Sequence, residues 1–544
     1  MKKRSAALGW LWEISGREKW KVFWMALVQA VLGLASVANA WLLRGLINAA
    51  VSADFPHFRA YAALFIGLLV FQLLARALYR HLLESARSAL ENAAKNRLFT
   101  VLLHKDYAAV TAVHTGEWLN RLTGDAAQIA DGLTAVFPEV LGMAVKLAAA
   151  IAMLLYLMPG LTGLIVVGGC ALIALTWAFR ATLKWLHKRI QEADGRLRVY
   201  LTERLGALMI LRAFGQEQSA AQGAREKTDE HRRARMKRNH FSNLCNLGFG
   251  AAMNGAYAIG AVYCGYGILT QSLDYGTFTA VLQLIGQIQS PFANLSGYLP
   301  RYYAMLASAE RMMEAESFAD DDTAGETPED FSEIRFQNVS FSYPGEAGAK
   351  LPVLRGMDFS LKKGEFLALV GHSGCGKSTA LKLLLGLYRP DSGSITLDGR
   401  PLGGGCRGLM AYVPQGNLLM RGTVREVVTF GEAVPEADFR RALALACADE
   451  FVDSLEHGAD TQLGERGAGL SEGQMQRLAI ARALCAGRKL LLLDEATSAL
   501  DEATERQVLE NLRRLTDQTV IAVTHRSAAL EICDKIIRME ETQP

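Results

Sequence analysis

The sequence lacks paired cysteines and a strong net charge, although it is 544 residues long. Its eight cysteines are scattered without a CxxC pair, so neither a disulfide framework nor a zinc site is indicated. The formal net charge is only +3. Because Lys and Arg cluster beside hydrophobic segments and do not form one basic domain, the sequence predicts no nucleic-acid partner. The cysteines are Cys170, Cys245, Cys264, Cys375, Cys406, Cys447, Cys485 and Cys533.

The length and the uneven hydrophobicity predict more than one domain. Single hydrophobic cores usually stop growing near ~250 to 300 residues. The composition is 51% hydrophobic and 21% charged, and the front half is far more apolar than the rest. We therefore expect a membrane domain joined to a soluble domain. Residues 10–20 mix Trp with Arg and Lys and contain no small-residue cleavage pattern, which favours an interfacial helix over a signal peptide; a solvated leader is the alternative.

Six apolar stretches are long enough to cross a bilayer, which needs roughly 20 mostly apolar residues per helix. The connection at 158–163 is so short that the third and fourth stretches must form a helical hairpin. The predicted spans are 22–46, 59–79, 134–157, 161–179, 244–268 and 277–299.

The basic residues orient these spans, because Lys and Arg are retained on the cytoplasmic side. The odd connections contain no Lys or Arg, although Arg44 and Arg59 flank the first of them, whereas the even connections contain many. Both termini are therefore expected in the cytoplasm. The even connections run for about 50 to 65 residues with charges at helical spacing, so we expect helices that continue beyond the bilayer. An acidic, apolar-poor run at 314–333 predicts a linker between a membrane domain, 1–313, and a soluble domain, 334–544.

A phosphate-binding loop is predicted after the apolar strand 366–370. The next residues fit GxxxxGK[ST] in the strand-loop-helix setting that this motif needs. Backbone N–H groups would surround the phosphates of ATP, Lys377 would neutralise the β and γ phosphates, and Ser378 would ligate Mg²⁺. Cys375 is a spacer or, alternatively, a thiol close to the phosphates. The candidate residues of the loop are Gly371, Ser373, Gly374, Cys375, Gly376, Lys377, Ser378 and Thr379.

A second buried strand, 489–493, ends in Asp494 and Glu495. Its four consecutive leucines predict burial on both faces, with two carboxylates at the carboxyl end. This is the Walker B arrangement. We expect Asp494 to orient Mg²⁺ and its waters, and Glu495 to polarise the attacking water.

The segment Leu470-Ser471-Glu472-Gly473-Gln474 lies between these two motifs and begins a helix. It resembles the LSGGQ signature of the ABC ATPase family, and the resemblance covers essentially the whole chain. The resemblance implies that Tyr343 stacks on adenine, that Gln415 touches Mg²⁺, that Asp501 lies in the D-loop and that His525 is the switch histidine. It also implies that Ser471, Gly473 and Gln474 close over ATP held by Lys377 of a second half-transporter, identical or related.

The membrane domain resembles the exporter type of this family. The segments 461–467, 114–117 and 121–125 are similar to exporter motifs, and 107–113 and 208–216 match the two coupling helices. The resemblance implies a six-helix, all-α transmembrane domain followed by an α/β P-loop ATPase domain. Such a protein would use ATP to move a cargo across a membrane by alternating access. The membrane is expected to be a bacterial plasma membrane, with the ATPase domain in the cytoplasm. Export is preferred; a siderophore or metal-chelate importer and an ATP-gated channel are the alternatives.

Polar residues inside the spans are candidates for contact with cargo. Lys146 either snorkels to the cytoplasmic interface or lines a cavity for an anionic or amphipathic cargo. Gln283 and Gln287 lie one turn apart on one helix face, where interhelical hydrogen bonds are the common role. The identity of the cargo stays open.

Overall fold

The computed structural model describes residues 2–321, 328–345, 350–416, 419–464, 467–515 and 517–539. The chain folds into two compact units, residues 1–99 with 118–314 and residues 100–117 with 315–544. Residues 322–327 of the predicted linker and Glu465 and Arg466 of the exporter-like segment lie outside the described residues.

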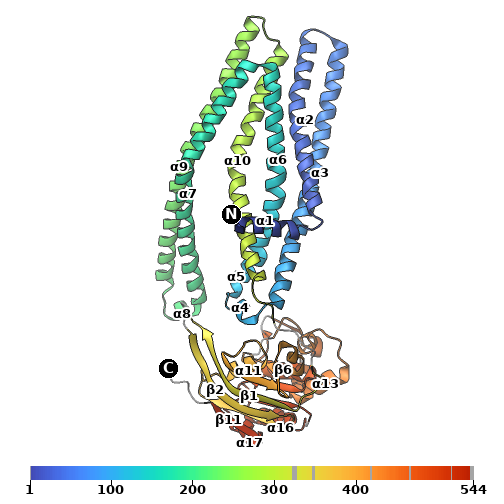
Figure 1. Ribbon diagram of the computed structural model, residues 1–544, viewed down its shortest axis with the longest axis vertical. Helices are drawn as coiled ribbons and strands as arrows, with labels where there is room; N and C mark the ends of the chain where they lie inside the picture. The colour runs from blue at the N-terminus through green and yellow to red at the C-terminus, as the bar shows by residue number, and fades with distance from the viewer. Residues whose placement is uncertain are drawn as a thin grey trace. The chain divides into compact units, whose positions relative to one another are not determined.

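The first unit is all helical, and each predicted span lies in a different long helix (Figure 1). The stretches 19–51, 55–104 and 115–157 are long and apolar enough to cross a membrane among the residues that the structure describes, and 159–169 is a shorter apolar stretch. The predicted helical transmembrane domain is confirmed. The helices are α1 (Lys2–Ile14), α2 (Lys19–Val51), α3 (Phe55–His104), α5 (Thr115–Asn120), the π-helix η1 (Arg121–Asp125), α6 (Ala126–Leu157), α7 (Pro159–Gly206), α8 (Leu208–Ala213), α9 (Glu217–Leu269) and α10 (Tyr275–Glu316).

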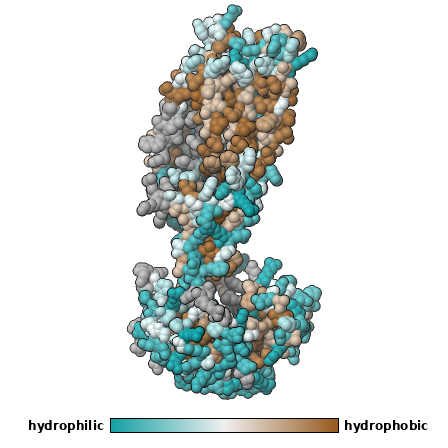
Figure 2. Space-filling model, turned by 45° about the vertical axis from the view of Figure 1, so that its right-hand side comes forward, coloured by the Kyte–Doolittle hydropathy of each residue, from teal (hydrophilic) through white to brown (hydrophobic). Residues whose placement is uncertain are grey.

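The long helices of this unit form two groups. Helix α2 packs closely on α6, whereas α7 pairs with α9, and Figure 1 shows the lower part of the α7–α9 pair standing apart from the other helices. Toward their outer ends α7 and α9 share a buried apolar cluster with α2, α6 and α10. Small residues permit the α2–α6 contact, because a Cβ atom added to Gly33 would lie 3.0 Å from the carbonyl oxygen of Gly142. Hydrophobic side chains cover much of the outer surface of these helices (Figure 2), as expected for contact with lipid.

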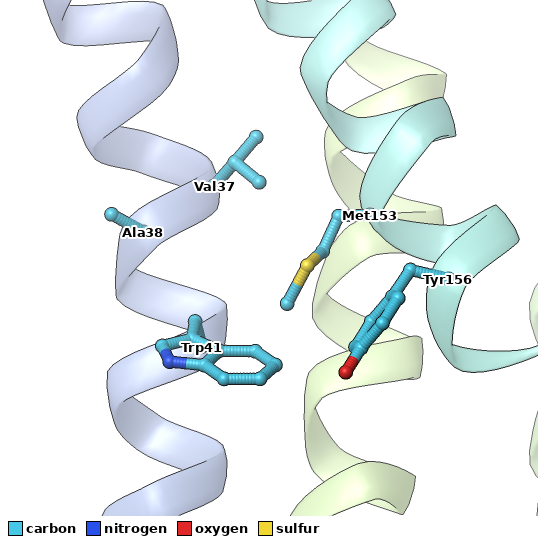
Figure 3. A pocket seen from close by; sticks show the side chains of 5 residues that line it. All are labelled: Val37, Ala38, Trp41, Met153 and Tyr156. Atoms are coloured by element: carbon cyan, nitrogen blue, oxygen red, sulfur yellow. The ribbon is translucent and has the colours of Figure 1, made fainter.

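An apolar pocket of about 360 Å³ lies between α2 and α6, lined by Val37, Ala38, Trp41, Met153 and Tyr156 (Figure 3). The Trp41 and Tyr156 rings project into it, with their centroids 6.2 Å apart. Both residues lie near the predicted outer ends of their spans, the depth at which aromatic side chains favour the membrane interface.

A buried charge network fixes the start of α6 to α10. The carboxylate of Asp125, only 2% exposed, accepts hydrogen bonds from the Arg311 guanidinium at 2.5 and 2.8 Å and from the Ser308 hydroxyl at 2.9 Å. Arg121, also buried, donates to the carbonyl oxygen of Arg311 at 2.8 Å and pairs with Glu314 at 3.0 Å. The π-helix that carries Arg121 and Asp125 aims both side chains at α10.

The second unit contains two large sheets. A five-stranded parallel sheet has the order β11-β3-β10-β9-β6, and an antiparallel sheet has the order β2-β1-β4-β5. All five residues of β9 are buried, as its leucine run predicts. The strands are β1 (Glu333–Pro344), β2 (Lys350–Lys362), β3 (Phe366–Gly371), β4 (Ser392–Leu397), β5 (Arg400–Pro401), β6 (Met410–Val413), β7 (Gly422–Thr423), β8 (Gln462–Leu463), β9 (Leu490–Asp494), β10 (Thr519–Val523) and β11 (Lys535–Met539).

Helices cover the parallel sheet and complete the predicted α/β domain. The hydrophobic core of this unit joins α12, α13 and α15 to β9 and β10. The helices are α11 (Lys377–Leu384), η3 (Gly404–Leu409), α12 (Val424–Thr429), α13 (Glu436–Leu445), α14 (Asp449–Asp453), η4 (Gly458–Asp460), α15 (Glu472–Cys485), α16 (Glu502–Arg513) and α17 (Ser527–Ile532).

The short helix α4 (Tyr107–Thr111) belongs to this second unit. The side chain of Asp106 caps it by accepting from the Ala109 amide at 3.0 Å. The segment that follows α10 pairs with the end of α3, because Lys105 forms an ion pair with Asp320 at 2.7 Å. The described start of the predicted linker is therefore held by specific contacts.

Candidate functional site

The candidate residues converge because β3, β9 and β10 are parallel neighbours. Val523 of β10 is in register with both Leu369 of β3 and Asp494 of β9. The chain leaves all three strands at the same edge of the sheet, where ligands of open parallel sheets usually bind. The loop after β3, the carboxylates after β9 and His525 after β10 therefore meet there.

The loop after β3 has the backbone shape of a phosphate cradle. Gly374 and Gly376 have φ angles of +87° and +98°, in the left-handed region that favours glycine. A Cβ atom at Gly376 would lie 2.6 Å from the Leu354 side chain, so the position has room only for hydrogen. The buried amine of Lys377 donates to the carbonyl oxygens of Gly371 and His372 at 2.7 and 2.9 Å. The loop thus surrounds the positively charged amine of Lys377 and ends at the N-terminus of α11.

The carboxylate of Asp494 is the buried centre of the site. Ser378 Oγ donates to its Oδ1 at 2.9 Å, and the Tyr412 hydroxyl donates to its Oδ2 at 3.2 Å. Burial raises the pKa of Asp494, as does the neighbouring Glu495 charge, whereas the two hydrogen bonds lower it. Burial and the Asp494 charge raise the pKa of Tyr412, which keeps its phenol a donor. A hydroxyl and a carboxylate are hard oxygen ligands, so Ser378 and Asp494 fit Mg²⁺.

Glu495 has a strained backbone, since its φ angle is +53°. Its amide donates to the carbonyl oxygen of Val523 at 3.1 Å, which fixes this conformation against β10. The Gln415 amide donates to one carboxylate oxygen at 2.9 Å, and Nε2 of His525 lies 3.9 Å from the other. Strain of this kind costs about 1–3 kcal/mol and collects at functional sites. Three of the predicted site residues are therefore in one cluster.

Aromatic rings surround Tyr343 at the end of β1. The Tyr343 ring lies 4.9 Å from Phe341 and 5.3 Å from Tyr388, with both contacts edge-on, and its hydroxyl is 3.3 Å from Thr379 Oγ1 of α11. Tyr107 of α4 makes a further edge-on contact with Tyr388 at 5.7 Å. The sequence motif identified Tyr343 but gave no signal for Tyr388.

The signature residues form a helix start. Ser471 and Gln474 make a capping box on α15, with bonds of 3.3 and 2.9 Å. Asp501 caps α16, and hydrogen bonds from Thr504 lower the pKa of Asp501. A Cβ atom at Gly473 would lie 3.0 Å from the carbonyl oxygen of Ala499. No hydrogen bond among the described residues joins Ser471 to the phosphate loop.

Two functional neighbours were missed from the sequence. Gln476 is buried and bonds Ser498 Oγ and the Ala499 amide, both at 2.9 Å, so it ties α15 to the loop before Asp501. Tyr412 precedes Gln415 in the sequence, but its contact with Asp494 follows only from the parallel β6–β9 pair, in which it is in register with Leu492, two residues before Asp494 and on the same face.

Comparison with known proteins agrees with this architecture. Residues 22–292 match the family model for the ABC transporter transmembrane region, and residues 354–498 match the ABC transporter model. The rat "Mitochondrial potassium channel ATP-binding subunit" is 31% identical over 97% of this chain and 78% of its own length. Mouse "ATP-binding cassette sub-family B member 10, mitochondrial" is 30% identical over 83% of this chain, but the match spans only 65% of the mouse protein.

A solved structure has the same fold. The "Structure of a bacterial Atm1-family ABC exporter with ATP bound" superposes with a TM-score of 0.79 at 23% identity, over 95% of this chain and 93% of that one. Two family models in tandem, a relative matched along nearly the whole chain and this shared fold agree with the site geometry. The chain belongs to the ABC transporter family.

Proposed function

We propose that this integral membrane protein uses ATP hydrolysis in its second unit to drive a cargo across the membrane through its first unit. The observation that carries the proposal is the cluster of Lys377, Asp494 and Glu495 at one edge of the parallel sheet, in a chain that also contains a helical transmembrane domain. The proposed domains are 1–313 and 334–544, joined by the linker 314–333.

Residues of the phosphate loop bind the nucleotide in this proposal. The amides of residues 373–379 donate to phosphate oxygens, and the Lys377 amine exchanges its two loop carbonyls for the β and γ phosphates. Tyr343 stacks on adenine, supported by the surrounding rings. Ser378, Asp494 and Gln415 hold Mg²⁺, which supplies charge neutralisation at the phosphate oxygens.

Glu495 is the proposed general base. Its carboxylate accepts from Gln415 and faces His525, so two neighbours fix its direction. In this position it orients the attacking water and takes up its proton, while His525 is placed near the γ phosphate. The positive φ angle at Glu495 turns the side chain away from the strand and toward the loop edge.

A second half-transporter completes each site. Ser471 and Gly473 lie at the start of α15 and make no contact with their own phosphate loop among the described hydrogen bonds, which supports their use on the nucleotide of a partner. Helices α4 and α8 are the proposed coupling helices. The partner is a second copy or a related chain.

We further propose export from a bacterial cell, with both termini and the ATPase unit in the cytoplasm. The absence of Lys and Arg from the odd connections supports this orientation. Import of a siderophore or metal chelate by the same fold is the alternative, and the direction of cargo uptake into sealed vesicles distinguishes the two.

A second candidate function is an ATP-binding channel subunit, favoured by the printed name of the rat relative. An ATP-gated channel would pass ions without one hydrolysis event per passage. Ion flux that persists in Glu495→Gln with ATP present would support this reading over transport.

The deciding experiment is Mg-ATP turnover of the purified chain in lipid nanodiscs, together with the particle mass. We expect dimeric particles whose turnover falls at least ~100-fold in Glu495→Gln, because a general base contributes about 10²–10⁴-fold. Glu502→Gln on α16 serves as the matched control. Dimers in which Glu495→Gln retains full turnover would refute the assigned base, and inactive monomers would show that a different chain completes the sites.

A further inference from the structure

Lys146 places a cation near the middle of the membrane. It lies about halfway along the predicted span 134–157, and its Nζ donates to Ser290 Oγ of α10 at 2.9 Å. The amine therefore points across the bundle at the depth of Ser290 and does not extend to the cytoplasmic interface. An ammonium has three N–H donors, and Ser290 is the one hydrogen-bond partner that the described residues give it.

The α2–α3 hairpin sets which residues of α3 share this depth. Tyr61 of α3 lies against Gly45 of α2, and Lys21 donates to Ser85 at 3.1 Å. In this antiparallel register Gln72 of α3 lies level with the middle of α2. At that level Gly33 packs against the backbone of Lys146.

Two further donors of α3 lie at or near this depth. Gln72 is 7% exposed, and its buried Nε2 has no hydrogen-bond partner among the residues that the structure describes. Arg76 follows one turn later on the same helix face, and its side chain is exposed. An unpartnered buried donor and two cations within predicted membrane spans both call for an acceptor of negative charge.

No carboxylate of the protein fills this role among the residues that the structure describes. Neither Lys146 nor Arg76 takes part in an ion pair there. Glu139, two turns before Lys146 on α6, accepts a hydrogen bond from Tyr298 instead. Two unpaired cations among apolar helices are costly unless an anion is bound.

We propose that Lys146, Arg76 and Gln72 form a subsite that binds the anionic group of an amphipathic molecule, a carboxylate, phosphate or sulfonate. Ser290 positions the Lys146 amine. The surrounding helices are apolar, so the rest of the ligand is a hydrocarbon. This proposal rests on the proposed transport function and names its cargo class. The anion comes either from a transported amphiphile or from a resident phospholipid headgroup.

The test uses the full-length protein in phosphatidylcholine nanodiscs, with oleoyl lysophosphatidate as the anionic probe and monooleoylglycerol as the neutral probe. We expect lysophosphatidate to change ATP turnover in the wild type and in Lys146→Arg. Its half-maximal concentration should rise about 10-fold or more in Lys146→Met, because a charge-assisted contact is lost. Monooleoylglycerol should act equally on all variants. Lys184→Met, an exposed lysine change on α7, is the matched control.

Each outcome decides the proposal. Equal half-maximal concentrations in the wild type and Lys146→Met, with both particles folded by thermal unfolding, would overturn the subsite even if ATP turnover is normal. Arg76→Met is the second variant, with the same expected loss. Lysophosphatidate that accumulates inside sealed vesicles identifies a cargo, whereas Lys146-dependent retention of phosphatidylglycerol without transport identifies a lipid headgroup. Loss of all turnover in the wild type would instead contradict the proposed function.

Discussion

At the scale of single residues, the hydroxyl of Tyr412 supports the proposed metal ligand Asp494. Removing it in Tyr412→Phe leaves the buried carboxylate with one fewer donor, a loss of about 1 kcal/mol. We expect the Mg²⁺ concentration for half-maximal ATP turnover to rise about 3- to 10-fold, with the KM for ATP at saturating Mg²⁺ unchanged. Tyr388→Phe, which keeps its ring contacts, is the control. An unaltered Mg²⁺ titration in Tyr412→Phe would contradict the assigned support.

The sequence motifs located the charged groups of the site but not their neighbours. Lys377, Asp494 and Glu495 were predictable because loop and strand patterns place them at strand ends. The Tyr412 contact depends on β6 lying beside β9, a long-range pairing that no local pattern encodes. The positive φ angle of Glu495 depends likewise on its amide bonding β10. The roles of these residues stay predictions.

At the scale of helices, the close α2–α6 contact depends on glycine. A Cβ atom at Gly142 would lie 2.8 Å from the Gln29 Cβ and 3.1 Å from its backbone oxygen, so valine there must push the helices apart. We expect Gly142→Val to cost about 1–3 kcal/mol of stability, measured as a lower thermal midpoint by tryptophan fluorescence. Gly168→Val on α7, where no atom lies within 4 Å of the added carbon, should change it far less. Equal thermal midpoints in the two variants would show that the α2–α6 contact accommodates a larger side chain without loss of stability.

The packing of α10 against the start of α6 also depends on the hydrogen bonds and ion pair of the buried Asp125. Asp125→Ala removes two hydrogen bonds from the Arg311 guanidinium, and because the Arg311 side chain is 43% exposed we expect a cost of about 1.5–3 kcal/mol. Asp131→Ala on the adjoining helix α6 breaks only an exposed pair with Arg87 and should cost less than ~1 kcal/mol. Thermal unfolding of the two variants measures the difference, and a comparable loss in both would mean that Asp125 is not a buried anchor.

Helix extents were partly predictable. Hydropathy located the apolar centres, and the charged spacing of the even connections indicated the long arms that α3, α7 and α9 provide. The acidic composition of residues 314–333 led us to predict a linker there. Composition could not show that Asp320 pairs with Lys105, because the partner is more than two hundred residues away.

At the scale of the whole molecule, the proposed ATP sites, each built from two copies of the chain, predict complementation. Under this proposal Lys377→Ala and Ser471→Arg each inactivate both sites of a dimer of identical copies. In a mixed dimer the two changes fall in one site and leave the other intact. With random pairing, we expect the mixture to regain about one quarter of wild-type turnover. The double variant Lys377→Ala/Ser471→Arg mixed with itself is the control and should regain nothing. A mixture as inactive as its components would argue against composite sites.

Helix α8 and the residue after it leave large apolar side chains exposed, with Met209 at 82% and Phe214 at 75% exposed. Surfaces of this kind are where chaperones and proteases act on newly made chains. A copy that finds no partner would thus be cleared from the cell while an assembled one persists. The amount of this protein would then follow the supply of its partner, even where transcription and intrinsic fold stability do not change.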